Sequence, residues 1–177
     1  DLIPREEKFY TAEIRDIILE KKNLIVDASS ADSVMAFLKE VSEYYSRRDL
    51  LRTAEIRDLI IDVLAPKISE GDSIANFGET IVGVVCSNKP AAELYSNRKS
   101  FSAILDCFPR ATTSESVQNV AASIISICRM NPGANKILND LPVVEAFSAI
   151  IPRATTDDSV IAISASIEEI VKNNEPA

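Results

Sequence analysis

The chain has 177 residues, 46% of them hydrophobic and 26% charged, which is typical of one folded domain and argues against disorder along its whole length. Its formal net charge is −8 and it has no basic arm, so binding to nucleic-acid phosphates is not expected. Histidine, the commonest general base and metal ligand, is absent. No apolar run approaches the ~18 residues that a membrane-spanning helix needs. The small number of glycine and aromatic residues favours helices over a β-sandwich.

The first informative feature along the chain is an internal repeat. Residues 11–18 recur as residues 53–60, at an offset of 42, with seven of eight residues identical. Residues 108–113 recur as residues 151–156, at an offset of 43. Because two different segments share almost the same period, we expect them to belong to one array of stacked units.

A third signature, an acidic residue followed by Ser and then Val or Ile, marks a long helix in each unit. Apolar residues at positions +2, +5, +9 and +12 from the acidic residue fall on one stripe of that helix. The acidic residue is expected in the first helical turn, where the helix dipole favours negative charge. Thr113 and Thr156 are predicted to cap two of the helices. The four copies of the signature begin at Asp32, Asp72, Glu115 and Asp158.

A medium helix precedes each signature, and in three units proline is expected to end it, at Pro66, Pro109 and Pro152. A short helix comes before it, for example between Asn131 and Leu141. Each unit is therefore a short, a medium and a long helix in about 42 residues. The chain is predicted to be a single all-α domain, an α-solenoid of about four repeats, with approximate ranges 1–47, 48–88, 89–131 and 132–177.

The segment from Asn131 to Ile151 resembles an armadillo repeat from its first helix into its second, and residues 158–171 resemble the third helix. HEAT repeats are the close alternative, but the three-helix unit and the Asn-Pro turn favour the armadillo family. The resemblance implies a right-handed superhelix whose third helices line a concave groove for peptides or other proteins. The Trp and Asn ladders of importin-α-like members are absent, since the matching positions hold residues such as Ser123 and Ile127. A receptor for nuclear-localisation peptides is therefore not expected.

Two sets of residues are candidate binding positions. The first contains residues of the third helices that lie off the buried stripe, where small polar side chains would let a partner's backbone approach. Solvated or close-packed helix faces are the alternative interpretation. The members of this set are Asn76, Thr80, Asn119, Ser123, Ser126, Ala162, Ser166 and Glu169.

The second set is the basic residue that follows each proline: Lys67, Arg110 and Arg153. In a solenoid these residues would form a row along one edge, where they could meet an acidic or phosphorylated segment. Interaction with the dipole at the end of the medium helix is the alternative, and we favour it.

The three cysteines, Cys86, Cys107 and Cys128, lie in apolar helical patterns and are interpreted as small buried hydrophobic residues. Their odd number and the lack of CxxC spacing do not indicate a disulfide framework. No signal peptide is visible. We therefore expect a cytoplasmic or other intracellular location, with the nucleus left open.

No catalytic, metal-binding or cofactor-binding motif occurs, so an enzyme is not expected. The leading hypothesis is a scaffold or adaptor that binds a peptide or helix of a partner protein along the concave groove. The alternative is a regulatory or oligomerisation module of a larger cytoskeletal, formin-like or transport protein. The start without Met suggests this alternative, as does an apolar N-terminal segment, Leu2-Ile3 and Phe9-Tyr10, through which the chain could self-associate.

Overall fold

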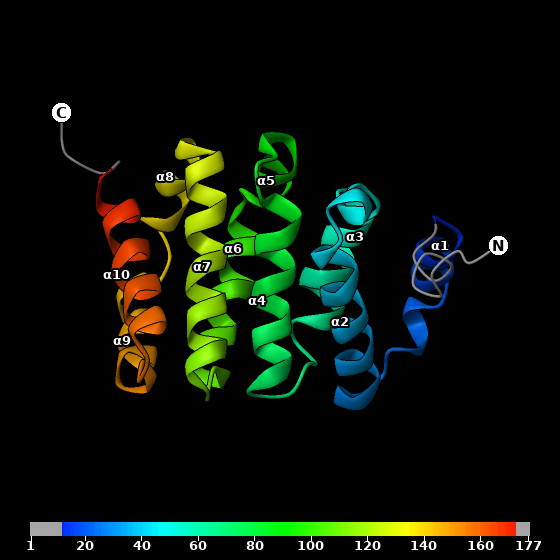
Figure 1. Ribbon diagram of the computed structural model, residues 1–177, viewed down its shortest axis with the longest axis horizontal. Coiled ribbons are helices and arrows are strands. Elements are labelled where there is room, and N and C mark those ends of the chain that lie inside the picture. The colour runs from blue at the N-terminus through cyan, green and yellow to red at the C-terminus, as the bar shows by residue number, and fades with distance from the viewer. Residues whose placement is uncertain (1–11, 173–177) are drawn as a thin grey trace.

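The computed structural model describes residues 12–172, and every regular element among them is helical (Figure 1). The all-α prediction is therefore confirmed for this part of the chain. The α-helices are α1 (Ala12–Glu20), α2 (Ala28–Glu43), α3 (Ala54–Asp58), α4 (Asp72–Val85), α5 (Lys89–Tyr95), α6 (Arg98–Cys107), α7 (Ser114–Met130), α8 (Asn135–Leu138), α9 (Val143–Ile150) and α10 (Asp157–Lys172). Shorter helical segments are η2 (Lys22–Leu24), η3 (Tyr45–Leu51), η4 (Leu59–Leu64), η5 (Phe108–Arg110), η6 (Pro132–Ala134) and η7 (Ile151–Arg153).

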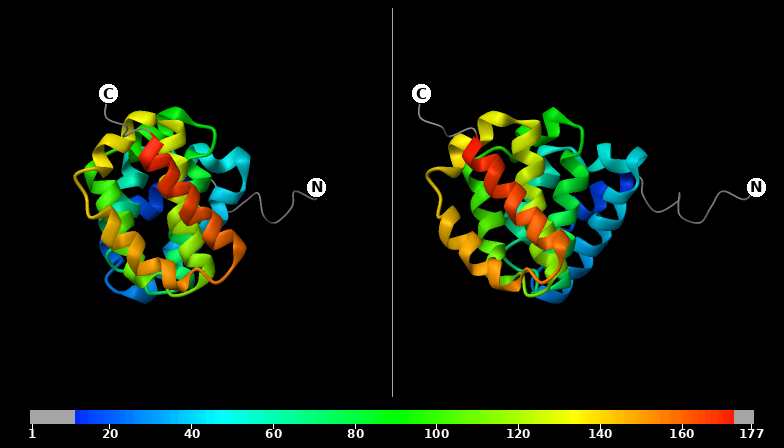
Figure 2. Two further views of the ribbon diagram at one scale, coloured as in Figure 1. Left: turned by 90° about the vertical axis from the view of Figure 1, so that its left-hand side faces the viewer. Right: turned by 60° about the vertical axis from the view of Figure 1, so that its left-hand side comes forward.

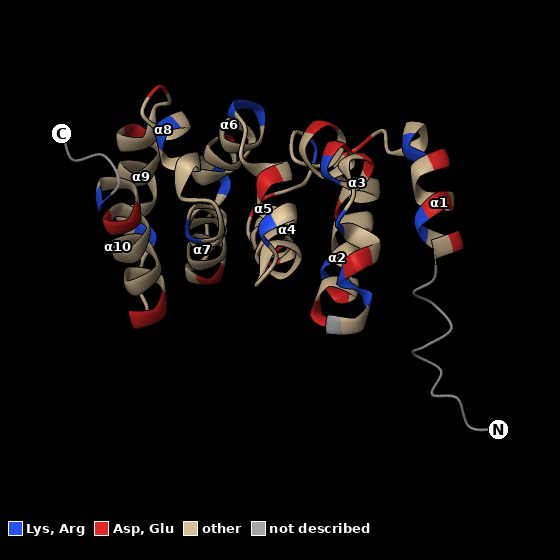
Figure 3. Cartoon of the chain, turned by 90° about the horizontal axis from the view of Figure 1, so that it is seen from above, with Lys and Arg blue, Asp and Glu red and all other residues tan. Residues whose placement is uncertain are grey.

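Four long helices, α2, α4, α7 and α10, lie side by side in chain order and form one layer (Figure 1). Helix α4 packs on both α2 and α7, and α7 also packs on α10. The medium helices α3, α6 and α9 form a second layer behind them, which is seen from above in Figure 3. Helices α5 and α8 lie near one end of the long helices. Each inner long helix therefore has a long helix on either side.

The long helices α7 and α10 begin with reciprocal side-chain caps. Thr113 Oγ1 accepts a hydrogen bond of 3.1 Å from the backbone N–H of Ser116, and the Ser116 hydroxyl accepts one of 3.0 Å from the N–H of Thr113. Thr156 and Ser159 repeat this arrangement at α10. The two predicted caps are confirmed, and the serine of the repeated signature is the second half of each cap.

The start of α2 differs from the prediction. This helix begins at Ala28 and is capped by Asp27, which accepts from the N–H of Ser30 at 2.9 Å. Asp32 therefore lies in the second turn and not in the first. In place of a role at the helix dipole, it accepts hydrogen bonds of 2.8 and 2.6 Å from the N–H and hydroxyl of Ser69, which precedes the next long helix.

The medium helices end where the prolines predict. Helix α6 stops at Cys107 and α9 at Ile150, two residues before Pro109 and Pro152, and each proline lies in a short 3₁₀ segment. In the second unit, α3 continues into η4, which is a π-helix ahead of Pro66.

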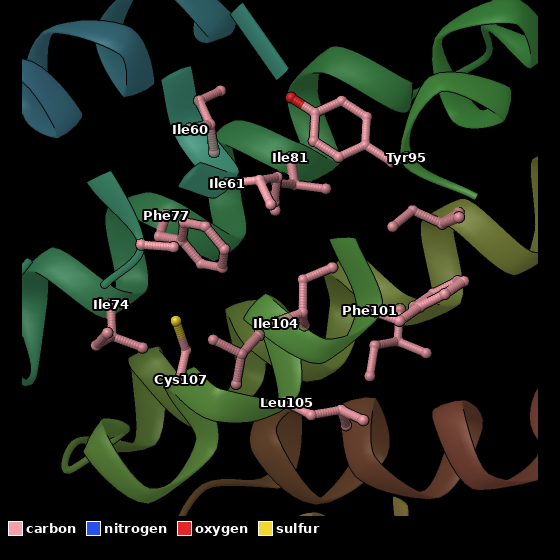
Figure 4. Packing of buried hydrophobic residues seen from close by; sticks show 14 of the residues in the cluster. Ile60, Ile61, Ile74, Phe77, Ile81, Tyr95, Phe101, Ile104, Leu105 and Cys107 are labelled. Carbon is pink, nitrogen blue, oxygen red and sulfur yellow. The ribbon is translucent and has the colours of Figure 1, made fainter. Parts of the chain in front are cut away.

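The apolar stripes of both layers meet in one core (Figure 4). Phe77 of α4 and Phe101 and Ile104 of α6 are fully buried there. Between the third and fourth units, Phe108 and Phe147 pack edge to face with ring centroids 5.1 Å apart. The core thus runs from unit to unit without a break at the predicted repeat boundaries.

Candidate interaction surface

The small polar residues predicted to line a groove are, for the most part, buried between neighbouring long helices. Thr80, Ser123 and Ser166 are each 0% exposed, and Ala162 is 8% exposed. The prediction that these four positions face a partner is therefore wrong. They lie on the flank of each long helix that packs against the preceding long helix, where a small side chain permits close approach.

Hydrogen bonds explain why polar side chains are tolerated on this flank. The Ser166 hydroxyl donates to the carbonyl oxygen of Ala121 on the neighbouring helix at 2.9 Å. Ser123 donates to Val120 within its own helix at 2.7 Å, and Asn119 Nδ2 donates to the carbonyl of Ala75 on α4 at 3.2 Å. Asn119 and Ser166 thus join neighbouring long helices, whereas Ser123 is satisfied within its own helix. Thr80 Oγ1 is the exception on this flank, because it is buried without a hydrogen-bond partner among the described residues.

A close approach of α4 and α7 involves a glycine that the sequence pattern did not single out. A Cβ atom placed on Gly78 of α4 would lie 2.4 Å from the carbonyl carbon of Asn119 in α7. The obstacle is backbone, so it cannot move aside as a flexible side chain could. Gly78 therefore sets the spacing of α4 and α7. The signal in the sequence was a glycine inside a predicted helix, where it otherwise costs stability.

The remaining members of the first predicted set, Asn76, Asn119, Ser126 and Glu169, are half-buried and reach solvent only in part. A second stripe that reaches solvent, next to these positions, runs along α4, α7 and α10 at positions 0 and +7 from the acidic signature residue, and on α7 and α10 also at +14; on α2 the corresponding residues Asp32 and Lys39 are half-buried. Steps of seven residues advance nearly two full turns, so these positions share one stripe. We call this stripe, together with the corresponding positions of α2, the long-helix face.

The centre of the long-helix face, at position +7, changes character along the layer. Lys39 and Glu79 occupy it on α2 and α4, and their charged groups lie 3.8 Å apart. Hydrogen bonding to Glu43 raises the pKa of Lys39. On α7 and α10 the same position holds Ala122 and Ala165, both half-buried. A partner lying across the layer would therefore meet an ion pair at one side and small apolar residues at the other.

Acidic residues border this face where the long helices begin. Asp72, Glu115 and Asp158 are all exposed. At the opposite end of the face, position +14 holds Arg129 on α7 and Lys172 on α10, both also exposed. On α7 and α10 the face therefore runs from negative to positive along the direction of the helices (Figure 3 shows both charge types over the molecule).

The basic residues predicted to form an edge row have a different role: they tie one unit to the preceding one. Arg110 donates through Nη1 to the carbonyl of Ile68 at 2.7 Å and through Nη2 to that of Ala65 at 2.6 Å. Arg153 donates through Nη1 to the carbonyls of Pro109 and Ala111 at 2.7 and 3.1 Å.

Lys67 makes the corresponding bond to the carbonyl of Ile25. All five acceptor carbonyls lie more than 40 residues back in the chain, close to the end of the preceding unit's medium helix. The favoured alternative placed each basic residue at the end of its own medium helix. The residues do bind carbonyls near the end of a medium helix, but that helix belongs to the preceding unit. Each of these side chains is therefore directed at backbone carbonyls of the preceding unit, and not at an acidic segment of a partner.

Two of the cysteines are buried as predicted, and burial raises the pKa of Cys107 and that of Cys128 to about 12 each. Both thiols therefore stay protonated at neutral pH and are poor nucleophiles. Cys86 is exposed at the end of α4, which corrects the prediction that all three are buried. Within residues 12–172, no group of three or more Cys, Asp or Glu side chains is placed to hold a metal ion.

None of the helices in the described range is both long and apolar enough to cross a membrane. The apolar N-terminal segment predicted to self-associate lies outside the described residues.

No protein-family model, no curated protein and no solved structure matches this chain. The likeness to armadillo repeats consequently rests on the repeated sequence register.

Proposed function

We propose that the protein is a non-enzymatic interaction scaffold, an armadillo-type α-solenoid that binds a peptide or helix of a partner protein across its long-helix face. The observation that carries the proposal is the common register of α4, α7 and α10, which places equivalent residues in rows across three adjacent helices. A surface built from repeated rows suits an elongated ligand, because each unit contributes one contact along it.

The chemistry of the face supports a protein partner. Ala122 and Ala165 leave room for a partner's side chains, while Asp72, Glu115 and Asp158 form a negative border. A peptide with an apolar strip and basic residues along one side complements this arrangement. The buried thiols and the lack of a catalytic motif favour a binding role over an enzymatic one.

The test is affinity capture with quantitative mass spectrometry, using the double variant Ala122→Arg/Ala165→Arg. We expect the variant to lose its partner, because two long cationic side chains then stand at the centre of the face. The matched control is Ala103→Arg/Ala149→Arg, which changes two half-buried alanines in the second layer. If both double variants remain folded and retain the partner equally, the long-helix face is not the binding surface.

A further inference from the structure

The outer side of the last unit exposes apolar side chains at positions that the preceding unit buries. Val144 of α9 is 76% exposed and Ile151 of η7 is 52% exposed. The residues 43 positions earlier are Phe101 and Phe108, and both are fully buried. The two units have the same pattern, and the difference arises because, within residues 12–172, α9 and α10 cover the third unit while no described element covers the fourth.

These exposed side chains line a groove of about 260 Å³ between α9 and α10, on the side that faces the viewer in the left panel of Figure 2. Almost all of its lining is hydrophobic. The residues that matter here are Val144, Phe147, Ile151, Ile167, Ile170 and Val171.

The covered unit shows what kind of structure fits such a face. In the third unit, α9 and α10 of the following unit lie against it, with α10 along α7 and Phe147 of α9 against Phe108. The covering elements are helices that present apolar side chains. The open groove, which continues this interface by one unit, therefore fits an amphipathic helix better than an extended strand.

The backbone at the open end also points to a basic residue in the occupant. In the third unit the carbonyls of Pro109 and Ala111 accept hydrogen bonds from Arg153. Pro152 and Ala154 occupy the same positions one period later, in the same short 3₁₀ turn. An Arg or Lys that follows the docking helix would reach these carbonyls as Arg153 reaches the earlier pair.

The charges beside the groove argue against a second copy of the chain as the occupant. Asp157 and Glu168 of α10 are both exposed on a helix that forms it, with Lys172 at the end of α10. Two copies joined through this face would bring the two carboxylates of each together. A partner whose apolar strip is bordered by Lys or Arg is attracted instead.

We propose that the groove between α9 and α10 binds an amphipathic helix of another protein, with Lys or Arg bordering its apolar side. The helix docks as the next unit of the array would, and a basic residue beyond its end binds the carbonyls of Pro152 and Ala154. This surface is separate from the long-helix face, so either site can fail without the other.

The probe for the test is a fluorescent peptide with the sequence of residues 98–113 and the change Cys107→Ser. In the folded chain this segment forms α6 and η5, and it carries an apolar face together with Arg98, Lys99 and Arg110. Its anisotropy is measured against the 177-residue chain. We expect saturable binding, weakened by salt, and a loss of affinity when the three basic residues are replaced by Gln.

Val144→Asp should weaken binding at least about tenfold, since it places a carboxylate in the groove that the apolar side chains fill. Because Val144 is largely exposed, this variant should fold normally. Ile161→Asp is the control: Ile161 is 63% exposed on α10 but does not line the groove, so affinity should change less than about twofold.

Three outcomes overturn the proposal. One is no saturation of the probe below about 1 mM, the weak limit of specific binding. Another is equal affinity for Val144→Asp and the wild-type protein. The third is a dimer in light scattering that Val144→Asp dissociates, which would make a second copy the occupant.

Discussion

Helices α7 and α10 carry the same apolar pattern but bury it to very different degrees. In α7, Val117 and Ile124 are both 0% exposed, whereas their equivalents in α10, Val160 and Ile167, are 49% and 39% exposed. Helix α7 lies between α4 and α10, and α10 has a described neighbour on one side only. The comparison shows that the repeated apolar pattern gives each long helix a surface on which another helix can pack. Whether that surface is buried depends on whether a neighbouring unit covers it.

The sharpest test of this comparison substitutes equivalent residues in the two helices. Ile124→Ala should lower the free energy of unfolding by about 2–5 kcal/mol, the usual cost of truncating a fully buried isoleucine. Ile167→Ala should cost less than about 1 kcal/mol, because that side chain already reaches solvent. Denaturant unfolding of both variants measures the difference. Equal losses would mean that α10 is covered in solution.

The contact between α7 and α4 can be disrupted by a substitution at Gly78. Gly78→Ala should lower the free energy of unfolding by about 1–3 kcal/mol, because its methyl group would overlap the backbone of Asn119 and force α4 and α7 apart. Gly133→Ala is the control, since a Cβ there meets only Asn131 Oδ1 at 3.6 Å. Thermal unfolding of both variants checks the prediction. A Gly78→Ala protein as stable as the control would disprove the close contact.

Removing the side-chain hydrogen bonds that join one unit to the next should lower the stability by a smaller amount. Arg110→Ala and Arg153→Ala should each lower the free energy of unfolding by about 1–2 kcal/mol, because backbone carbonyls of the preceding unit lose a charged donor. Hydrogen exchange should show faster opening of α9 and α10 in Arg153→Ala than in Arg110→Ala, since the last unit has fewer other contacts. Lys136→Ala, at an exposed position of α8, should leave the exchange unchanged.

The smallest expected effect is a pH dependence of the protein's stability. It arises at Asp32, which links α2 to Ser69, the residue that lies shortly before α4. Burial disfavours the charged form of Asp32, but hydrogen bonds from Ser69 outweigh it and hold the pKa of Asp32 below its ordinary value of 3.8. The carboxylate therefore stabilises the fold above that value, and the contribution is lost as the pH falls through the lowered pKa.

Asp32→Asn tests this linkage. The variant should be less stable than the wild type near pH 7, and the difference should shrink as the pH is lowered below about 4. Melting temperatures of the two proteins between pH 7 and pH 3 measure it. A difference that stays constant over this range would show that Asp32 does not act through its charge.

Much of the fold could be predicted from the sequence because its determinants are local. The 42–43-residue period, the apolar stripe at +2, +5, +9 and +12, the prolines that end α6 and α9, and the caps at Thr113 and Thr156 all act within one unit. Helical periodicity distinguishes the buried stripe from the rest of a helix. The residues that it assigned to the stripe of α4 and α7 are all fully buried, but the stripe missed Thr80 and Ser123, which are fully buried as well.

The candidate site was harder to predict, because a helix has two flanks beside its buried stripe and its exposed face, and the sequence does not say which flank meets a neighbour. Ser123 and Ser166 were assigned to a groove on account of their small polar side chains, but smallness equally suits close helix packing. Arg110 and Arg153 bind carbonyls that lie more than 40 residues earlier in the chain. A pattern of neighbouring residues therefore cannot predict these hydrogen bonds.

By itself, the sequence determined the helices, their register and the repeated unit, because hydrogen bonding along a helix and the burial of one stripe depend on residues close together in the chain. Only the tertiary structure decided which small residues lie between helices, where the basic side chains bind, and which apolar face stays open. These properties depend on the neighbouring unit, and the same residues have different surroundings in the middle of the array and at its end.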